Sequence, residues 1–350
     1  MTAPTALVRR RTSAWSSEAV AQVVAALSAA TGLTWVLTAH VLPIGSPAQA
    51  VLVGLGAFVA LYALAVASVD TWAAARDRLA AALFTLCGLA LLSALLAVVT
   101  FTALRGWHAV VHSNFWTETT ATTGPNDPLT SGGALAAIVG TLEQVGIAGL
   151  ISVPLGLATA VYLNEVGGRL ARVVRTVIDA MSAIPGIVAG LFVFAVIVLT
   201  LGFSRSGLAA AIALSIEMLP VVTRTGEVVL RLVPGPLREA SYALGSTQWQ
   251  TVRKVVLPTA RTGLVTAVLL GVARVIGETA PILLTSGFTA ELNADPAHGP
   301  QVSLPLFIFT QVRFPLDNAI SRAFGAALVL LVVVVVLFAT ARLLSRKKLT

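Results

Sequence analysis

The sequence predicts an all-α polytopic membrane protein with about eight transmembrane helices. Hydrophobic residues make up 57% of the 350 residues and charged residues only 11%, and the mean hydropathy is +0.91. Such a composition excludes an ordinary soluble domain. The apolar residues occur in runs of about 20, the length of a helix that crosses a bilayer. Basic residues gather in every second gap between these runs, as they do in multi-pass proteins.

Eight apolar runs have the length of a span. They cover roughly residues 19–42, 48–69, 79–104, 134–163, 176–202, 207–223, 262–286 and 319–344. The fifth and sixth are irregular, because Pro185 and Gly186 interrupt one and Glu217 lies within the other.

The basic residues orient the chain. With a cytoplasmic N-terminus, 18 of the 23 Lys and Arg residues fall inside, four fall outside and Arg274 lies in the membrane. This agrees with the positive-inside rule and places both termini in the cytoplasm. Orientation and anionic lipid therefore account for the net charge of +8, and nucleic acid is excluded as a partner. A cleaved secretory signal is the alternative for the first run, although that run is about twice the usual length.

Motifs for several other functions are missing. The single cysteine, Cys87, allows neither a disulfide framework nor a cysteine metal site. His108 and His112 are four residues apart, but two ligands are too few for a metal, so we predict no metal site. The chain contains no Gly-x4-Gly-Lys-Ser/Thr loop and no His-Glu-x-x-His motif. We therefore predict a chain that is not an enzyme and that binds no cofactor of its own.

The segment 224–261 is too charged to cross a membrane, and we expect it to form a helical hairpin in the cytoplasm. Pro236 suits the first turn of one helix and Gly245 its C-terminal cap. Thr247 and Gln250 have the spacing of a capping box that opens a second helix. We expect Pro258 to end that second helix, whose apolar stripe includes Trp249.

The hairpin resembles the cytoplasmic signature of ABC importer permeases, which reads Glu-Ala-Ala, three residues, Gly, nine residues, Ile-x-Leu-Pro. The residues that match in register are Glu239, Ala240, Gly245, Leu257 and Pro258. Ser241 and Val255 depart from it conservatively. The resemblance implies a coupling helix, here with Trp249 on its apolar face, that seats in a groove of a separate ATPase dimer. ATP and Mg would then be used by that partner.

Charged residues within or beside the spans are the candidates for a substrate path, because such groups usually face a bundle interior or a watery path. They are Glu143, Glu217, Arg224, Arg274 and Glu278. The last two are four residues apart and share a helix face near the middle of the seventh predicted span.

Arg274 suits a tetrahedral oxyanion, since a guanidinium offers paired N–H donors to two oxygens. Glu278 would hold the arginine while the site is empty and accept a hydrogen bond from a protonated oxygen, which favours phosphate over sulfate. An interhelical ion pair that carries no substrate is the alternative.

Three collinear stretches, 162–165, 219–225 and 273–281, resemble the PstA-type permease of the phosphate-specific ABC importer. The resemblance implies a six-helix type I importer core over 79–350, preceded by an N-terminal extension, 1–78, with two additional spans. It also implies that Arg274 and Glu278 belong to the translocation path and that Arg224 lies at its cytoplasmic mouth. For Glu143, pairing with an arginine of a neighbouring helix is an equal alternative.

The same resemblance implies the assembly and the activity. The chain would form a heterodimer with a PstC-like sister permease in a bacterial inner (plasma) membrane and receive inorganic phosphate from an extracytoplasmic PstS-like binding protein. ATP hydrolysis on the partner would drive alternating access. The alternatives are a permease for another oxyanion, sulfate or molybdate, and a non-transporting membrane subunit with a structural or signalling role. For Glu217, a helix-packing role is as open as a transport role.

Overall fold

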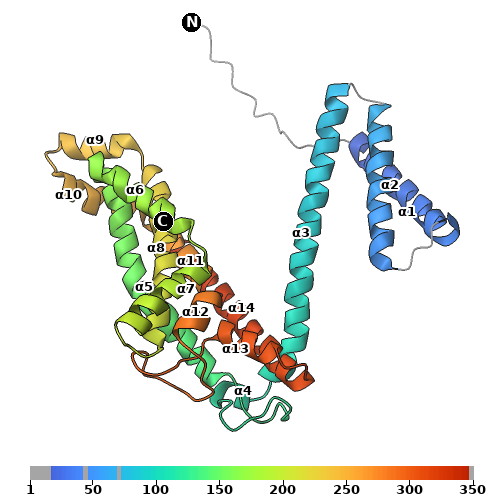
Figure 1. Ribbon diagram of the computed structural model, residues 1–350. Coiled ribbons are helices and arrows are strands. Elements are labelled where there is room, and N and C mark those ends of the chain that lie inside the picture. Colours follow the sequence, from blue (N-terminus) through green and yellow to red (C-terminus); the bar gives the residue numbers. More distant parts are fainter. Residues whose placement is uncertain (1–16, 42–45, 69–71, 347–350) are drawn as a thin grey trace, which may run out of the picture. The chain divides into compact units, whose positions relative to one another are not determined.

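The computed structural model describes residues 17–41, 46–68 and 72–346, and all regular elements in these ranges are helical (Figure 1). The chain forms two compact units, Met1–Val98 and Val99–Thr350. The long helix α3 (Trp72–Val110) belongs to both units. The division of function after residue 78 stays a prediction.

The first unit contains α1 (Ser17–Val36), which continues as the π-helical turn η1 (Leu37–Val41), then α2 (Pro47–Ala67) and the first part of α3. Its small core holds Ala26, Tyr62, Val66 and Ala75. Arg78 on α3 donates a hydrogen bond to Gln22 on α1 at 3.1 Å. The two additional spans therefore fold as one helical hairpin against the start of α3.

The second unit carries the rest of the chain. After α3 it contains α4 (Asn114–Thr117), α5 (Leu135–Val161), η2 (Tyr162–Val166), α6 (Gly168–Ser182), α7 (Gly186–Val193), η3 (Phe194–Thr200), α8 (Gly207–Arg231), α9 (Gly235–Ala243), α10 (Gln248–Thr251), η4 (Val252–Val256), α11 (Leu257–Val275), α12 (Ala280–Thr285), α13 (Leu304–Val312) and α14 (Asp317–Arg346). The central element is α8, which packs against α5, α6, α7, α11 and α12.

Small residues allow α8 to lie this deep. Ser206 caps its N-terminus by accepting a hydrogen bond from the Ala209 N–H at 3.3 Å. On the facing helices, Gly156 of α5 and Gly271 of α11 both lie against Val222 of α8, where a Cβ atom would overlap its side chain. Helices in membranes approach closely through such residues, because van der Waals packing rather than the hydrophobic effect holds them together.

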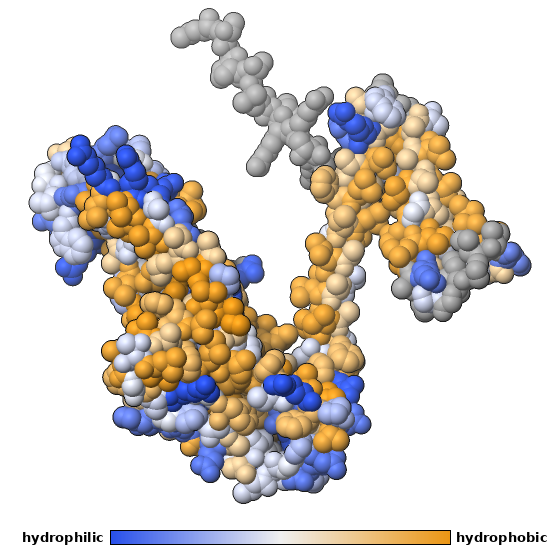
Figure 2. Space-filling view, viewed as in Figure 1, coloured by the Kyte–Doolittle hydropathy of each residue, from blue (hydrophilic) through white to orange (hydrophobic). Residues whose placement is uncertain are grey.

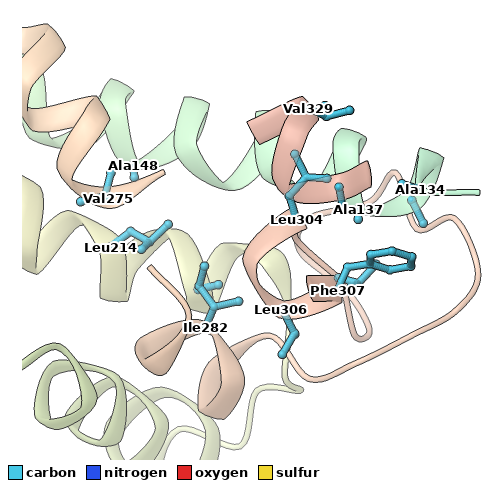
Figure 3. Packing of buried hydrophobic residues seen from close by; sticks show 14 of the residues in the cluster. Ala134, Ala137, Ala148, Leu214, Val275, Ile282, Leu304, Leu306, Phe307 and Val329 are labelled. Atoms are coloured by element: carbon cyan, nitrogen blue, oxygen red, sulfur yellow. The ribbon is translucent and has the colours of Figure 1, made fainter. Parts of the chain in front are cut away.

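The main core lies around α8, where side chains from α11, α12 and α13 meet (Figure 3). Leu214 of α8, Val275 of α11 and Ile282 of α12 point toward one another, and Leu306 of α13 extends the cluster (Figure 3). Outside this core, apolar side chains such as Leu150 remain exposed. On the face in Figure 2, apolar residues of the second unit form a band between hydrophilic surfaces at its two ends, as expected for a bundle that crosses a membrane.

Seven helices among the described residues are long and apolar enough to cross a membrane, and the bent pair α6 and α7 with η3 makes an eighth candidate. The number of spans predicted from the sequence is therefore confirmed. The predicted interruption of the fifth span at Pro185 and Gly186 is confirmed, because the chain bends by 103° between Ser182 and Gly186. Pro185 causes this break, since it lacks an N–H group and keeps the preceding residue away from helical geometry.

Two predictions around the seventh span are wrong. Pro258 does not end a helix, because α10, η4 and α11 follow one another without interruption from Gln248 to Val275. The π-helical turn Val252–Val256 ends two residues before the proline, and such local changes of helical geometry allow a helix to continue through a residue that lacks an N–H group. At the other end, the span stops at Val275 instead of continuing to residue 286, and Glu278 lies beyond it.

Candidate functional site

Two interrupted helices meet near the middle of the second unit (Figure 1). One break separates α6 from α7, and the other separates α11 from α12. The two short helices pack together, and a Cβ atom on Gly190 of α7 would overlap the backbone of Pro281 on α12. Interrupted helices at membrane depth are tolerated where they line a cavity or are buried in protein, and they form substrate sites in many transporters.

Arg274 lies in the last turn of α11, beside the second break. Its Nη1 atom pairs with Oε1 of Glu278, and its Nη2 atom lies 3.6 Å from Oε2 of Glu217 on α8. The Arg274 side chain is 52% exposed, whereas the Glu278 side chain is 20% and the Glu217 side chain 7% exposed. One guanidinium thus lies between two carboxylates and keeps a face open.

Glu217 is the less satisfied of the two carboxylates. Among the described residues, neither of its buried side-chain oxygens has a hydrogen-bond partner. Its carboxylate lies against Gly186, the first residue of α7, where a Cβ atom would overlap it. Gly186 thus leaves room for the Glu217 carboxylate in the position it occupies, and a larger residue there would displace the end of that side chain.

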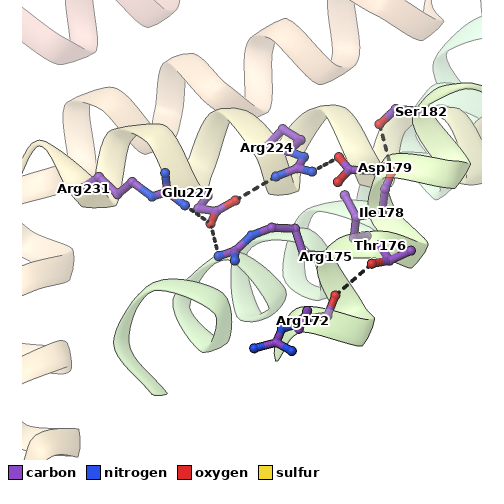
Figure 4. Close-up of polar contacts among 9 residues, drawn as sticks. All are labelled: Arg172, Arg175, Thr176, Ile178, Asp179, Ser182, Arg224, Glu227 and Arg231. Carbon is purple, nitrogen blue, oxygen red and sulfur yellow. Dashed lines mark hydrogen bonds and ion pairs between the residues drawn. The ribbon is translucent and has the colours of Figure 1, made fainter. Parts of the chain in front are cut away.

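Arg224 lies in a separate network in the C-terminal part of α8 (Figure 4). It pairs with Asp179 of α6 and, at 3.2 Å, with Glu227. The buried Glu227 carboxylate also pairs with Arg175 at 2.6 Å and with Arg231 at 2.5 Å. This network joins α6 to α8, and it does not contact Arg274.

Glu143 takes part in an amide network, and this replaces the ion pair with an arginine that was one of its two alternatives. Its Oε2 atom accepts a hydrogen bond from Nε2 of Gln301, which also donates to the Asn293 carbonyl at 3.0 Å. Gln144 in turn donates to the side-chain and backbone oxygens of Gln301 at 3.1 Å and 3.2 Å. The segment before α13 is thereby fixed to α5, away from Arg274.

The hairpin formed by α9 and α10 has both caps as predicted. Gly245 ends α9 with a φ angle of +79°, a conformation that favours glycine. Thr247 and Gln250 form the reciprocal capping box that opens α10. Glu239 and Ala240 are exposed on α9.

Apolar side chains project from this hairpin. Trp249 is 66% exposed, and Leu244 is 87% exposed. Leu257 is half-buried at the start of α11, and Pro258 is exposed in its first turn. An exposed apolar surface on a charged loop is typical of a docking surface.

Arg238 fixes the hairpin to η2, the turn that follows α5, a link that the sequence analysis missed. Its guanidinium donates to Oε1 of Glu165 at 2.8 Å and to the Leu230 and Val233 carbonyls at 3.0 Å and 2.7 Å. Gln248 adds a hydrogen bond to the Glu165 carbonyl at 2.5 Å.

Glu227 was also missed, and here the sequence carried a signal. Arg224 and Arg231 lie three residues before and four residues after it, both on its helix face. Within the described ranges, no three His, Cys, Asp or Glu side chains are grouped closely enough to hold a metal ion.

Comparison with known proteins identifies the class. Residues 152–349 match the family described as binding-protein-dependent transport system inner membrane component. This match covers more than half of the chain, so the protein belongs to that family and is a non-catalytic, multi-pass permease subunit.

Individual relatives narrow the class. Over 231 residues, which are 66% of this chain and 75% of the relative, the sequence is 48% identical to phosphate transport system permease protein PstA 1 of Mycobacterium tuberculosis (strain CDC 1551 / Oshkosh). It is 44% identical to PstA of Mycobacterium leprae over the same shares of the two chains, and 35% identical to PstA of Pasteurella multocida over 65% of this chain and 80% of the relative. A solved chain of the MetNI methionine ABC transporter in an inward-facing conformation superimposes with a TM-score of 0.49 and 24% identity, over 59% of this chain and 92% of that chain.

Proposed function

We propose that this chain is the permease subunit of an ABC importer and moves inorganic phosphate into the cytoplasm by alternating access. The observation that carries the proposal is Arg274, a partly open guanidinium placed where two interrupted helices meet. The similarity to PstA permeases at up to 48% identity supports phosphate as the substrate. None of the relatives named above is described as a permease for sulfate or molybdate, the alternative oxyanions.

The chemistry of the site fits a small oxyanion. Glu278 occupies one end of the guanidinium, and the 3.6 Å contact with Glu217 is longer than a hydrogen bond. N–H donors of Arg274 therefore remain for the oxygens of a phosphate that enters from the open face. Glu278 holds the arginine in place when no anion is bound.

The hairpin connects this site to a source of energy. Exposed Leu244 and Trp249 form an apolar surface that suits the groove of a separate ATPase dimer, where ATP and Mg are bound. One uninterrupted helix runs from Gln248 beside this surface to Val275 beside Arg274. A displacement of the hairpin therefore reaches the site directly.

The assembly we propose has three further components: the ATPase dimer, a PstC-like sister permease and a PstS-like extracytoplasmic binding protein. The positive-inside pattern supports cytoplasmic termini in a bacterial inner membrane. A non-transporting structural subunit has no use for an ATPase-docking hairpin that is rigidly joined to an intramembrane arginine. We therefore favour transport.

Uptake of radiolabelled phosphate by the reconstituted complex tests the proposal, with ATPase activity measured in the same vesicles. Arg274→Gln is expected to abolish uptake while assembly and basal ATPase activity persist, because only the anion site is lost. Glu239→Ala is expected to reduce uptake by weakening ATPase docking. Arg313→Gln, at an exposed arginine beside Phe309, is the control and leaves both activities unchanged.

Two results contradict the proposal. Undiminished phosphate uptake by Arg274→Gln removes that residue from the path. If the wild-type complex takes up sulfate or molybdate and not phosphate, the assignment of phosphate as the substrate is refuted.

A further inference from the structure

The site around Arg274 has an excess of negative charge. One guanidinium faces two carboxylates, those of Glu217 and Glu278, and among the described residues no further cation pairs with either of them. A fully deprotonated anion that binds to Arg274 would face uncompensated repulsion from both carboxylates. A proton between the anion and one of the carboxylates turns that repulsion into a hydrogen bond.

The two carboxylates are not equally available to accept a hydrogen bond from a protonated anion. Glu278 has a close partner in Arg274. Glu217 has both oxygens buried without a hydrogen-bond donor within the described part of the chain, and its guanidinium contact is 3.6 Å long. A buried acceptor without a donor is costly, and in native proteins it calls for a specific explanation. The missing donor fits a group that enters with the substrate.

The backbone supports this assignment. The Glu217 carboxylate occupies the space that a side chain on residue 186 would fill, at the first residue of α7. Glycine at position 186 thus leaves space for the acceptor at the helix break. The buried carboxylate therefore lies directly at the α6–α7 break.

We propose that Glu217 determines specificity by accepting a hydrogen bond from a hydroxyl group of the bound phosphate, so that the site selects protonated oxyanions. This assignment rests on the proposed function. Inorganic phosphate keeps at least one P–OH group near neutral pH, whereas sulfate and molybdate are dianions without one. An anion that lacks a hydroxyl group offers Glu217 no hydrogen-bond donor, so the lone pairs of the anion and of the carboxylate repel each other.

The first test needs no mutation. The wild-type complex of permeases and ATPase, in nanodiscs without the binding protein, is equilibrated with radiolabelled phosphate and competed with sulfate and with monofluorophosphate. Monofluorophosphate keeps the phosphorus centre and the size of phosphate, but at mildly alkaline pH it has no hydroxyl group. We expect phosphate to bind at least about 100-fold more tightly than either competitor, because a site built to pair with a hydroxyl strongly rejects analogues without one. Equal competition by monofluorophosphate overturns the proposal.

The second test uses Glu217→Gln, which keeps the shape of the side chain and supplies an N–H donor. We expect the preference for phosphate over monofluorophosphate and sulfate to fall at least about tenfold, because the amide can donate to an oxygen that carries no proton. Glu278→Gln is expected to leave the preference within about twofold of wild type, since that carboxylate is already paired. Glu143→Gln is the matched control away from the site.

The outcomes separate the two proposals. If Arg274→Gln abolishes phosphate binding but the preference survives Glu217→Gln, or follows Glu278 instead, this inference fails and the proposed function stands. If the wild-type complex binds no phosphate, or Arg274→Gln binds it normally, the proposed function itself fails.

Discussion

Glu227 anchors three arginines, and its replacement by glutamine should destabilise the protein more than any surface change. Its side chain is 3% exposed and pairs with Arg175, Arg224 and Arg231, whose side chains are 37%, 33% and 58% exposed. A buried hydrogen bond to a charged group contributes about 1.5–3 kcal/mol. The arginines can return to water, so we take about 1 kcal/mol for each pair and about 3 kcal/mol in total. The equilibrium constant of unfolding then changes about 150-fold.

Thermal unfolding of the purified complex measures this effect. A loss of about 3 kcal/mol lowers the melting temperature by roughly 6–12 °C in a unit of this size. Glu291→Gln, at an exposed glutamate of the loop before α13, is the control and should shift it by less than about 2 °C. A melting temperature of Glu227→Gln within the error of wild type would show that the network stabilises nothing.

Two further predictions concern arginines outside the substrate path. Buried Arg322 donates to the carbonyls of the loop 124–131, including that of Asp127 at 2.8 Å. Arg322→Met should therefore lower the free energy of unfolding by at least about 3 kcal/mol and expose this loop to limited proteolysis. Unchanged cleavage would show that Arg322 does not hold the loop. Arg238→Gln should leave ATPase docking intact but reduce the phosphate transported per ATP several-fold, because the hairpin loses its ion pair with Glu165. An unchanged number of phosphate ions per ATP would show that this ion pair does not couple the hairpin to transport.

The sequence predicted most of what depends on local pattern. The lengths of the apolar runs gave the number of spans, because bilayer thickness sets them directly. The two caps of the hairpin, at Gly245 and Thr247, were also predictable, since each depends on residues within one turn. The pairing of Arg274 with Glu278 followed from a spacing of four, although α11 ends between them.

The remaining features depend on contacts between distant segments. A proline inside a helical pattern normally stops the helix. At Pro258 the helix continues, and the π-helical turn before the proline is visible only in the structure. Pairing of Glu143 with an arginine was one of two alternatives, yet its partner is Gln301, which lies 158 residues away. The approach of Glu217 to Arg274 could not be predicted either, because α8 and α11 meet only through tertiary packing.

Because the helix is continuous across Pro258, a movement at its hairpin end is transmitted to the end beside Arg274. From Gln248 to Val275 the helix has 28 residues, so it is about 42 Å long, more than the hydrocarbon thickness of a bilayer. A tilt of about 5° at one end of such a rod displaces the other end by about 4 Å. That displacement is as large as the 3.6 Å between Arg274 and Glu217. Because Glu227 ties α8 to α6, we expect a hairpin that tilts α11 to change the separation of the guanidinium and the Glu217 carboxylate and, under the proposed function, the affinity for phosphate.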